Sequence, residues 1–295
     1  MGAFSSYHPI VLFCYYLIVI LLSVTVWHPV VTVMTLAGSV GLFLVRRWKH
    51  RKELLEHVIY YFFLYLLLAV IHPLFDHDGE HILFFLNDNP VTEEAVRYGS
   101  AIGIVIIAVI FWVKACYEML STDKILYLLS RLSGRLALFV SMGMRFFPLM
   151  KQRIKEVERA QKTMGLYTGK SFVDKVSCRF RVFGAVVTWI IEYMAVSVSS
   201  MRARGYGQGK RSNYSIYHIR KKDTAMLFLC GVAAFLWIWG SYTKVLSYSY
   251  YPYMSTISKS RSAVITYIGI GVFFFLPSLV ELKENIKWKL LKLKI

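Results

Sequence analysis

The stretch VFGAVVTWIIEYMAVSVSSMRARGYGQGKRS, residues 182–212, decides how the chain is laid out. Residues 182–199 are apolar enough to cross a membrane, but arginines flank this run on both sides. Membrane proteins concentrate Lys and Arg in cytoplasmic loops, so these flanks predict that both ends of the run are cytoplasmic. Glu192, in the middle of the run, makes spanning costly. We therefore expect a long helix lying along the inner membrane surface. The flanking arginines are Arg179, Arg181, Arg202 and Arg204.

The composition predicts that lipid is the solvent for much of the chain. Of the 295 residues, 57% are hydrophobic, and the mean hydropathy is +0.50, whereas soluble domains are usually about 45–50% apolar. The net charge of +18 is explained by basic cytoplasmic loops, so we expect no nucleic-acid partner. The cysteines are scattered without metal-type spacing and are interpreted as small apolar fillers. They are Cys14, Cys116, Cys178 and Cys230.

Six runs have the length and character of membrane spans, each of which needs about 20 apolar residues. The first is interpreted as a retained membrane helix, because it has neither the charged start nor the cleavage site of a signal peptide. The second follows directly after His28-Pro29. The predicted spans are residues 9–27, the run that follows Pro29, and residues 57–71, 96–116, 225–243 and 262–280.

Charge orients these spans. The cluster RRWKHRK that follows the second span is placed inside, so the N-terminus is also inside and the acidic loop at 72–94 is outside. The basic segment 117–223 and the basic C-terminal tail then fall inside. The tyrosines between the last two spans suit an interfacial position beside an outer loop. They are Tyr248, Tyr250, Tyr251 and Tyr253.

The sequence thus predicts an all-α polytopic membrane protein with about six transmembrane helices and a cytoplasmic helical domain. The expected divisions are 1–123, with about four spans, 124–223, the cytoplasmic domain, and 224–295, with about two spans and the basic tail.

The cytoplasmic domain has room for about three helices, expected at 124–146, 148–165 and 171–205. Pro148 is predicted to separate the first from the second, and Gly165 with Gly169 the second from the third.

The motifs of nucleotide-binding and catalytic sites do not occur. GYGQGK follows a helix, whereas a phosphate-binding loop follows a strand and precedes a helix. We expect no catalytic residues and no cofactor, and any ATP must be used by another chain. The outer loop carries histidines and carboxylates, which suit several divalent ions, but a solvated turn explains them as well, and no metal site is assigned. These residues are His72, Asp76, His77, Asp78, Glu80 and His81.

Several segments, taken in order, resemble one family. His8-Pro9 and His28-Pro29 bracket the first helix, and HPLFDHDG, LFFLNDNPVTEEAVRYG, STDKILYLL, SMGMRFFPLM, RAQKTMG, SMRARGYGQGKRS and IKWKLLKLKI follow. Together they resemble the transmembrane T component of energy-coupling factor (ECF) transporters, the EcfT/CbiQ-like family. The resemblance runs through most of the chain, and its most specific signature is an Ala-Arg-Gly triplet that ends a long cytoplasmic helix.

The resemblance implies a scaffold that couples two ABC-type ATPase subunits to a small membrane protein, the S component, which binds a vitamin or metal ion. Two motifs would dock the ATPases. The second motif consists of Arg202, Ala203, Arg204 and Gly205. The first motif is degenerate and consists of Ala160, Gln161, Lys162, Met164 and Gly165.

Met164 stands where the family commonly has Arg, which leaves two alternatives: Lys162 or Arg159 supplies the charge, or Met164 packs into an apolar groove. A local helix cap is the alternative explanation of Arg204.

The implied location is the plasma membrane of a prokaryote, multi-pass, with both termini cytoplasmic. The alternative functions are a polytopic membrane enzyme and a stand-alone carrier, each using the outer-loop histidines and aspartates.

Overall fold

The computed structural model describes residues 4–47, 51–76, 79, 81–86, 89–165, 172–209, 217–251 and 254–292. They fall into two compact units, each described by itself. Unit 1 comprises Met1–Thr122 and Tyr217–Ile295, and unit 2 comprises Asp123–Ile216.

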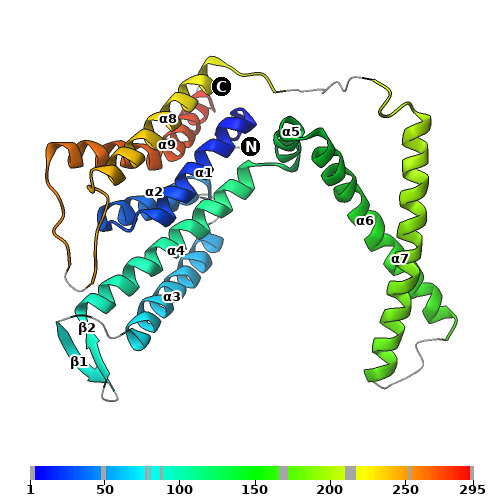
Figure 1. Cartoon of the computed structure of the whole chain (residues 1–295), viewed down its shortest axis with the longest axis horizontal. Coiled ribbons are helices and arrows are strands. Elements are labelled where there is room, and N and C mark those ends of the chain that lie inside the picture. Colours follow the sequence, from blue (N-terminus) through cyan, green and yellow to red (C-terminus); the bar gives the residue numbers. More distant parts are fainter. Residues whose placement is uncertain are drawn as a thin grey trace. The chain divides into compact units, whose positions relative to one another are not determined.

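Helices make up almost all of both units, so the predicted all-α polytopic membrane fold is confirmed (Figure 1). Unit 1 contains η1 (Phe4–Ser6), α1 (Pro9–Thr25), α2 (Pro29–Arg47), α3 (Arg51–Phe75), β1 (Ile82–Leu86), β2 (Asn89–Thr92), α4 (Glu93–Met119), α8 (Lys221–Tyr242) and α9 (Arg261–Lys292). Unit 2 is built from α5 (Thr122–Leu132), α6 (Gly134–Thr163) and α7 (Phe172–Ala203).

Among the described residues, six helices are long and apolar enough to cross a membrane. They are α2, the Glu56–Phe75 part of α3, α4, α7, α8 and α9. The described residues thus contain as many candidate spans as the sequence predicts, but the two sets of helices are not the same. Helix α1, predicted to span, has only 17 residues, and α7, predicted to lie on the inner surface, has the composition of a span. The placement of α7 along the membrane surface stays a prediction.

Small residues let the helices of unit 1 approach closely, as is usual where helices associate within a membrane. A Cβ atom on Gly38 of α2 would lie 3.0 Å from the carbonyl oxygen of Phe274 in α9. A Cβ atom on Gly99 of α4 would lie 3.0 Å from the Ala69 carbonyl oxygen in α3. Helices α3 and α4 accordingly run side by side (Figure 1).

The core of unit 1 is aromatic, and hydrogen bonds between helices pair several of its polar atoms. Trp112 of α4 is fully buried, and its indole N–H donates to Thr35 Oγ1 of α2 over 3.0 Å. The Tyr15 hydroxyl of α1 donates to the Phe273 carbonyl oxygen of α9 over 3.1 Å. These bonds connect four helices through groups that would be costly to bury unpaired.

A buried carboxylate joins the first turns of α1 and α8. Asp223 Oδ1 accepts the His8 backbone N–H over 2.9 Å, and Oδ2 accepts the Arg220 N–H over 2.8 Å. His8 in turn caps α1, because its Nδ1 accepts the Ile10 N–H over 3.3 Å. Backbone donors at helix starts have no partner within the helix, so these side chains satisfy them.

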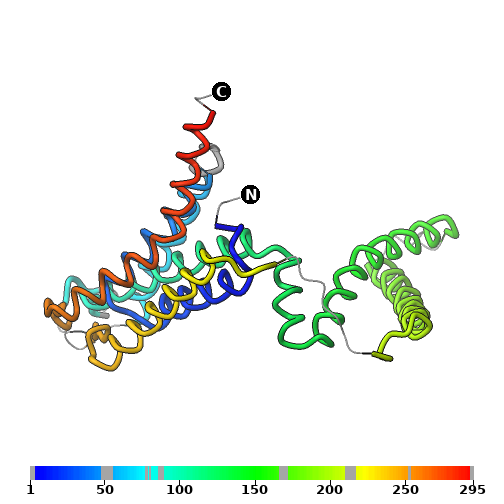
Figure 2. The backbone as a smooth tube through the Cα atoms, turned by 90° about the horizontal axis from the view of Figure 1, so that it is seen from above, coloured from blue at the N-terminus to red at the C-terminus, as the bar shows by residue number. Residues whose placement is uncertain are grey.

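Two local expectations were wrong or incomplete. Pro148 lies inside α6, which continues through it, and Pro277 likewise lies inside α9, a continuous orange-to-red helix in Figure 2. The separation of α5 from α6 occurs instead at Ser133, whose backbone is extended. A proline removes one helical hydrogen bond, which the many remaining bonds of these long helices outweigh. The outer loop, expected only as a loop, contains the antiparallel hairpin β1–β2, with Ile82 opposite Thr92.

Candidate functional site

The C-terminal end of α7 holds the second motif in a defined cap. Gly205 has a φ of 79°, the left-handed conformation that glycine adopts without strain. Its N–H donates to the Arg202 carbonyl oxygen over 3.0 Å, and the Tyr206 N–H donates to the Met201 carbonyl oxygen over 3.1 Å. This pair of bonds is the Schellman motif, with Arg204 at the cap and Gly205 directly after it. Ala203 is the last residue of the helix.

The end of α6 repeats this geometry with the first motif. Gly165 has a φ of 75°, and its N–H donates to the Lys162 carbonyl oxygen over 3.1 Å. Met164 is the cap residue, and its N–H donates to the Ala160 carbonyl oxygen over 3.1 Å. Met164 and Arg204 therefore occupy equivalent positions at the ends of two helices. The predicted end of the second cytoplasmic helix at Gly165 is confirmed, whereas Gly169 lies outside the described residues.

The two ends differ in what they expose. Arg202 and Arg204 have exposed side chains, and neither forms a salt bridge with any residue that the structure describes. Their guanidinium groups present planar forks of donors, suited to carboxylate and carbonyl partners. Met164, by contrast, presents an apolar side chain that is 73% exposed.

The one charged residue of the first motif, Lys162, is paired within α6. Lys162 Nζ lies 2.9 Å from Glu158 Oε1, one helical turn earlier. This hydrogen bond and the charge of the ammonium hold the pKa of Glu158 below its usual value, with Arg179 adding to the effect. Gln161 Oε1 is buried and has no hydrogen-bond partner among the residues that the structure describes. Of the alternatives for a charge at this end, Lys162 already has a carboxylate partner, while Arg159 is exposed.

Helices α6 and α7 cross at an aromatic contact (Figure 1). The ring of Phe146 stacks on Trp189, with centroids 6.0 Å apart, and lies 5.6 Å from Tyr193. The Arg153 guanidinium lies 5.7 Å from the Trp189 ring centroid. Sequence reasoning missed this contact, although Trp189 and Tyr193 are four residues apart and so share a helix face.

The two capped ends extend well beyond this crossing. At 1.5 Å per helical residue, Gly165 is about 28 Å along α6 from Phe146, and Arg204 is about 22 Å along α7 from Trp189. Figure 1 shows the end of α6 and the end of α7 pointing away from each other. The two capped ends are therefore separate ends of one crossed pair of helices.

Unit 2 also exposes a large apolar surface. Single exposed apolar residues are ordinary, but extended patches mark interaction sites or contact with lipid. On α6 the exposed side chains are Leu136, Phe139, Met142, Met144 and Phe147. On α7 they are Phe172, Val173, Phe180, Phe183, Ile191, Met194, Val196 and Val198.

The outer-loop residues give no metal centre within the described ranges. His72 Nε2 lies 3.7 Å from Asp76 Oδ2, and His81 is exposed. In the part of the chain that the structure describes, no group of three or more His, Cys, Asp or Glu residues is arranged to hold a metal ion. His77, Asp78 and Glu80 lie outside the described residues.

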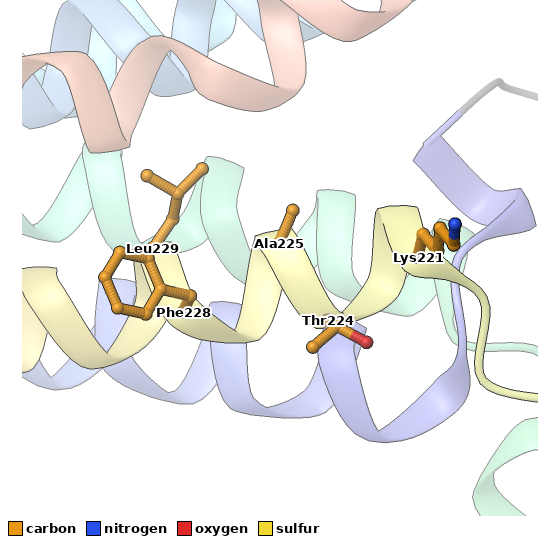
Figure 3. Close-up of a pocket in the computed structure, with 5 residues that line it drawn as sticks. All are labelled: Lys221, Thr224, Ala225, Phe228 and Leu229. Atoms are coloured by element: carbon orange, nitrogen blue, oxygen red, sulfur yellow. The ribbon is translucent and has the colours of Figure 1, made fainter.

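A surface hollow of about 700 Å³ lies along α8 (Figure 3). Lys221 and Thr224 lie toward the start of the helix, and Ala225, Phe228 and Leu229 continue the lining. The lining is mostly apolar, so this hollow brings together no set of groups suited to acid–base or nucleophilic chemistry.

A family model described as CbiQ, cobalt transport protein, matches residues 6–215, which is more than half of the chain. This match includes the first motif and the second motif. No curated protein matches the chain.

Proposed function

The chain belongs to the CbiQ cobalt transport protein family, and we propose that it is the transmembrane scaffold of an ECF-type ABC importer. In this role it couples ATP hydrolysis in two partner ATPase subunits to uptake of a vitamin or a transition-metal ion. The family description names cobalt. The substrate is bound by a separate S component, so this chain does not select it.

The observation that carries the proposal is the matched pair of helix ends. Each ends in a glycine with positive φ, at Gly165 and Gly205, and each places one exposed side chain, Met164 or Arg204, at the cap. Glycine after the cap lets a partner backbone approach closely. Because Arg204 lacks a salt bridge among the described residues, its guanidinium is available to an ATPase carboxylate or carbonyl.

We assign the residue roles from the resemblance of the two motifs to those of the family, and the geometry of the helix ends supports them. Arg204 is the charged anchor of the second motif, with Arg202 beside it and with Ala203 and Gly205 shaping the helix end. In the first motif, Met164 inserts into an apolar groove, while Ala160, Gln161, Lys162 and Gly165 form the helix end behind it. Unequal anchors suit two ATPase surfaces that differ in polarity.

The exposed apolar surface of α6 and α7 supports a role in gripping the S component, because a membrane partner buries such side chains favourably. The coupling domain, 124–223, is placed on the cytoplasmic side together with both termini, in a prokaryotic plasma membrane. The basic segments at 117–223 and in the tail support this orientation.

A pull-down from native membranes in mild detergent tests the proposal. The tagged wild-type protein should bring down ATPase subunits and a small membrane protein, and Arg204→Ala should bring down less ATPase. If the wild type recovers its membrane partner but no ATPase, the coupling role is refuted. An unchanged ATPase yield with Arg204→Ala would refute the role of that arginine.

A further inference from the structure

A small aromatic pocket in unit 1 lies where several helices end. Its volume is about 370 Å³. It is formed by the second residue after α1, the residue after α3, the first part of α4 and the segment after α8. The lining residues are Trp27, Asp76, Tyr98, Tyr248, Ser249, Tyr250 and Tyr251.

Tyr98 lies at the centre of the aromatic cluster. Its ring stacks on Trp27 with centroids 5.5 Å apart, and it lies 5.3 Å from both Tyr250 and Tyr251. Tyr248 lies 4.7 Å from Tyr250 and extends the cluster. Aromatic faces carry negative potential, and several rings around one space attract a cation within about 6 Å of their centroids.

The polar groups of the pocket also favour a cation. Asp76 contributes a carboxylate that is 38% exposed, with one oxygen, Oδ2, 3.7 Å from His72 Nε2. Tyr250 is 7% exposed, and its buried hydroxyl has no hydrogen-bond partner among the described residues. Burial, reinforced by Tyr248 and Tyr98, raises the pKa of Tyr250 to about 12. The neutral phenol oxygen keeps lone pairs that can accept an N–H bond.

The neighbouring arginine, Arg97, does not oppose the binding of a cation in the pocket. Arg97 precedes Tyr98, but its guanidinium bonds to Glu93 one turn earlier and to Met254 Sδ at 3.1 Å. The pocket therefore combines π faces, a carboxylate and a buried acceptor, while the adjacent guanidinium is engaged elsewhere.

We propose that this pocket binds an alkylammonium group, supplied by the ethanolamine headgroup of a zwitterionic membrane lipid. Trp and Tyr residues at the ends of apolar helices lie at headgroup depth in a bilayer, which is the depth of the ethanolamine group of such a lipid. The ammonium contacts the aromatic rings that line the pocket and pairs with Asp76. This inference does not depend on the ATPase-docking role.

Native mass spectrometry of the purified full-length protein tests the proposal. Phosphatidylethanolamine and phosphatidylglycerol with identical acyl chains are added to wild type, Tyr98→Leu, Asp76→Asn and the control Tyr60→Leu. Tyr60 lies on α3 and is 63% exposed. The wild type should retain phosphatidylethanolamine in preference to phosphatidylglycerol. Tyr98→Leu should weaken that retention about 5-fold to 30-fold, Asp76→Asn should weaken it as well, and Tyr60→Leu should not.

A second set of measurements distinguishes a lipid headgroup from a soluble compound as the source of the ammonium group. Displacement of phosphatidylethanolamine by tetramethylammonium chloride would support the pocket as an ammonium site. A raised melting temperature with that salt, but without any lipid preference, would overturn the lipid source. Equal retention of both lipids, unchanged in Tyr98→Leu and Asp76→Asn and unaffected by the salt, would overturn the proposal. If Tyr98→Leu does not fold, the retention of phosphatidylethanolamine by Asp76→Asn tests the proposal, because this substitution preserves side-chain shape.

Discussion

Replacing Arg204 with methionine copies, at the end of α7, the residue that stands at the equivalent position of α6. In the described structure Arg204 is exposed and forms no salt bridge. The folded chain should therefore lose only the interaction of its charge with the helix dipole, about 0.3–1 kcal/mol. If the guanidinium docks into an ATPase groove, removing it leaves a partner group unpaired and costs about 2–5 kcal/mol.

The expected losses of folding and of binding free energy differ enough to distinguish a local capping role of Arg204 from a docking role. A loss of about 2–5 kcal/mol weakens the affinity for the ATPase by about 30-fold to several-thousand-fold, whereas the melting temperature should change little. The assay is a titration of the detergent-solubilised protein with purified ATPase subunits, read by fluorescence anisotropy, beside a melting curve. Arg181→Met is the matched control, because Arg181 is an exposed arginine near the other end of the same helix.

A dissociation constant for Arg204→Met within twofold of the wild-type value would refute the docking role and leave the local cap as the explanation. An equal loss in Arg181→Met would also refute it, since the effect would then report total positive charge. The reciprocal change, Met164→Arg, should leave α6 folded, because the side chain is 73% exposed and a cation suits a helix C-terminus.

Three further changes test the architecture. Gly205→Ala should cost about 1–2 kcal/mol of helix-end stability and weaken ATPase binding, because the residue has a φ of 79°; Gly205→Asn, which tolerates this conformation better, should lose less. Trp189→Ala removes the stacking on Phe146 and should broaden the distance distribution between spin labels at the ends of α6 and α7; an unchanged distribution would contradict the crossing. Gly38→Ala should destabilise unit 1 by about 1–3 kcal/mol, because the new Cβ would lie 3.0 Å from backbone atoms of Phe274; Gly41→Ala, whose nearest contact would be 3.6 Å, is its control in melting curves.

The helix ends were predictable because their signals are local. A glycine at Gly165 or Gly205 after a long helical run stops the helix through its own backbone, whatever the surroundings. Apolar length likewise predicted the membrane helices of unit 1, because spanning a bilayer requires about 20 such residues.

Other features depend on contacts that no local pattern contains. Pro148 was expected to break a helix, but the length of α6 outweighs the loss of one hydrogen bond. The stacking of Phe146 on Trp189 joins two helices, and periodicity identifies a helix face without identifying its partner. The aromatic pocket around Tyr98 gathers residues from four segments, of which the sequence indicated only an interfacial group of tyrosines.

The backbone-made caps at the ends of α6 and α7 have an evolutionary consequence. Because glycine and main-chain hydrogen bonds form each cap, the side chain at the cap position contributes little to folding. Substitutions at Met164 and Arg204 can therefore change the affinity for a partner subunit with little effect on the stability of the fold. Such a position can follow changes in a co-evolving subunit by single substitutions, and a duplicated and diverging pair of ATPases could be accommodated at one end without remodelling the other.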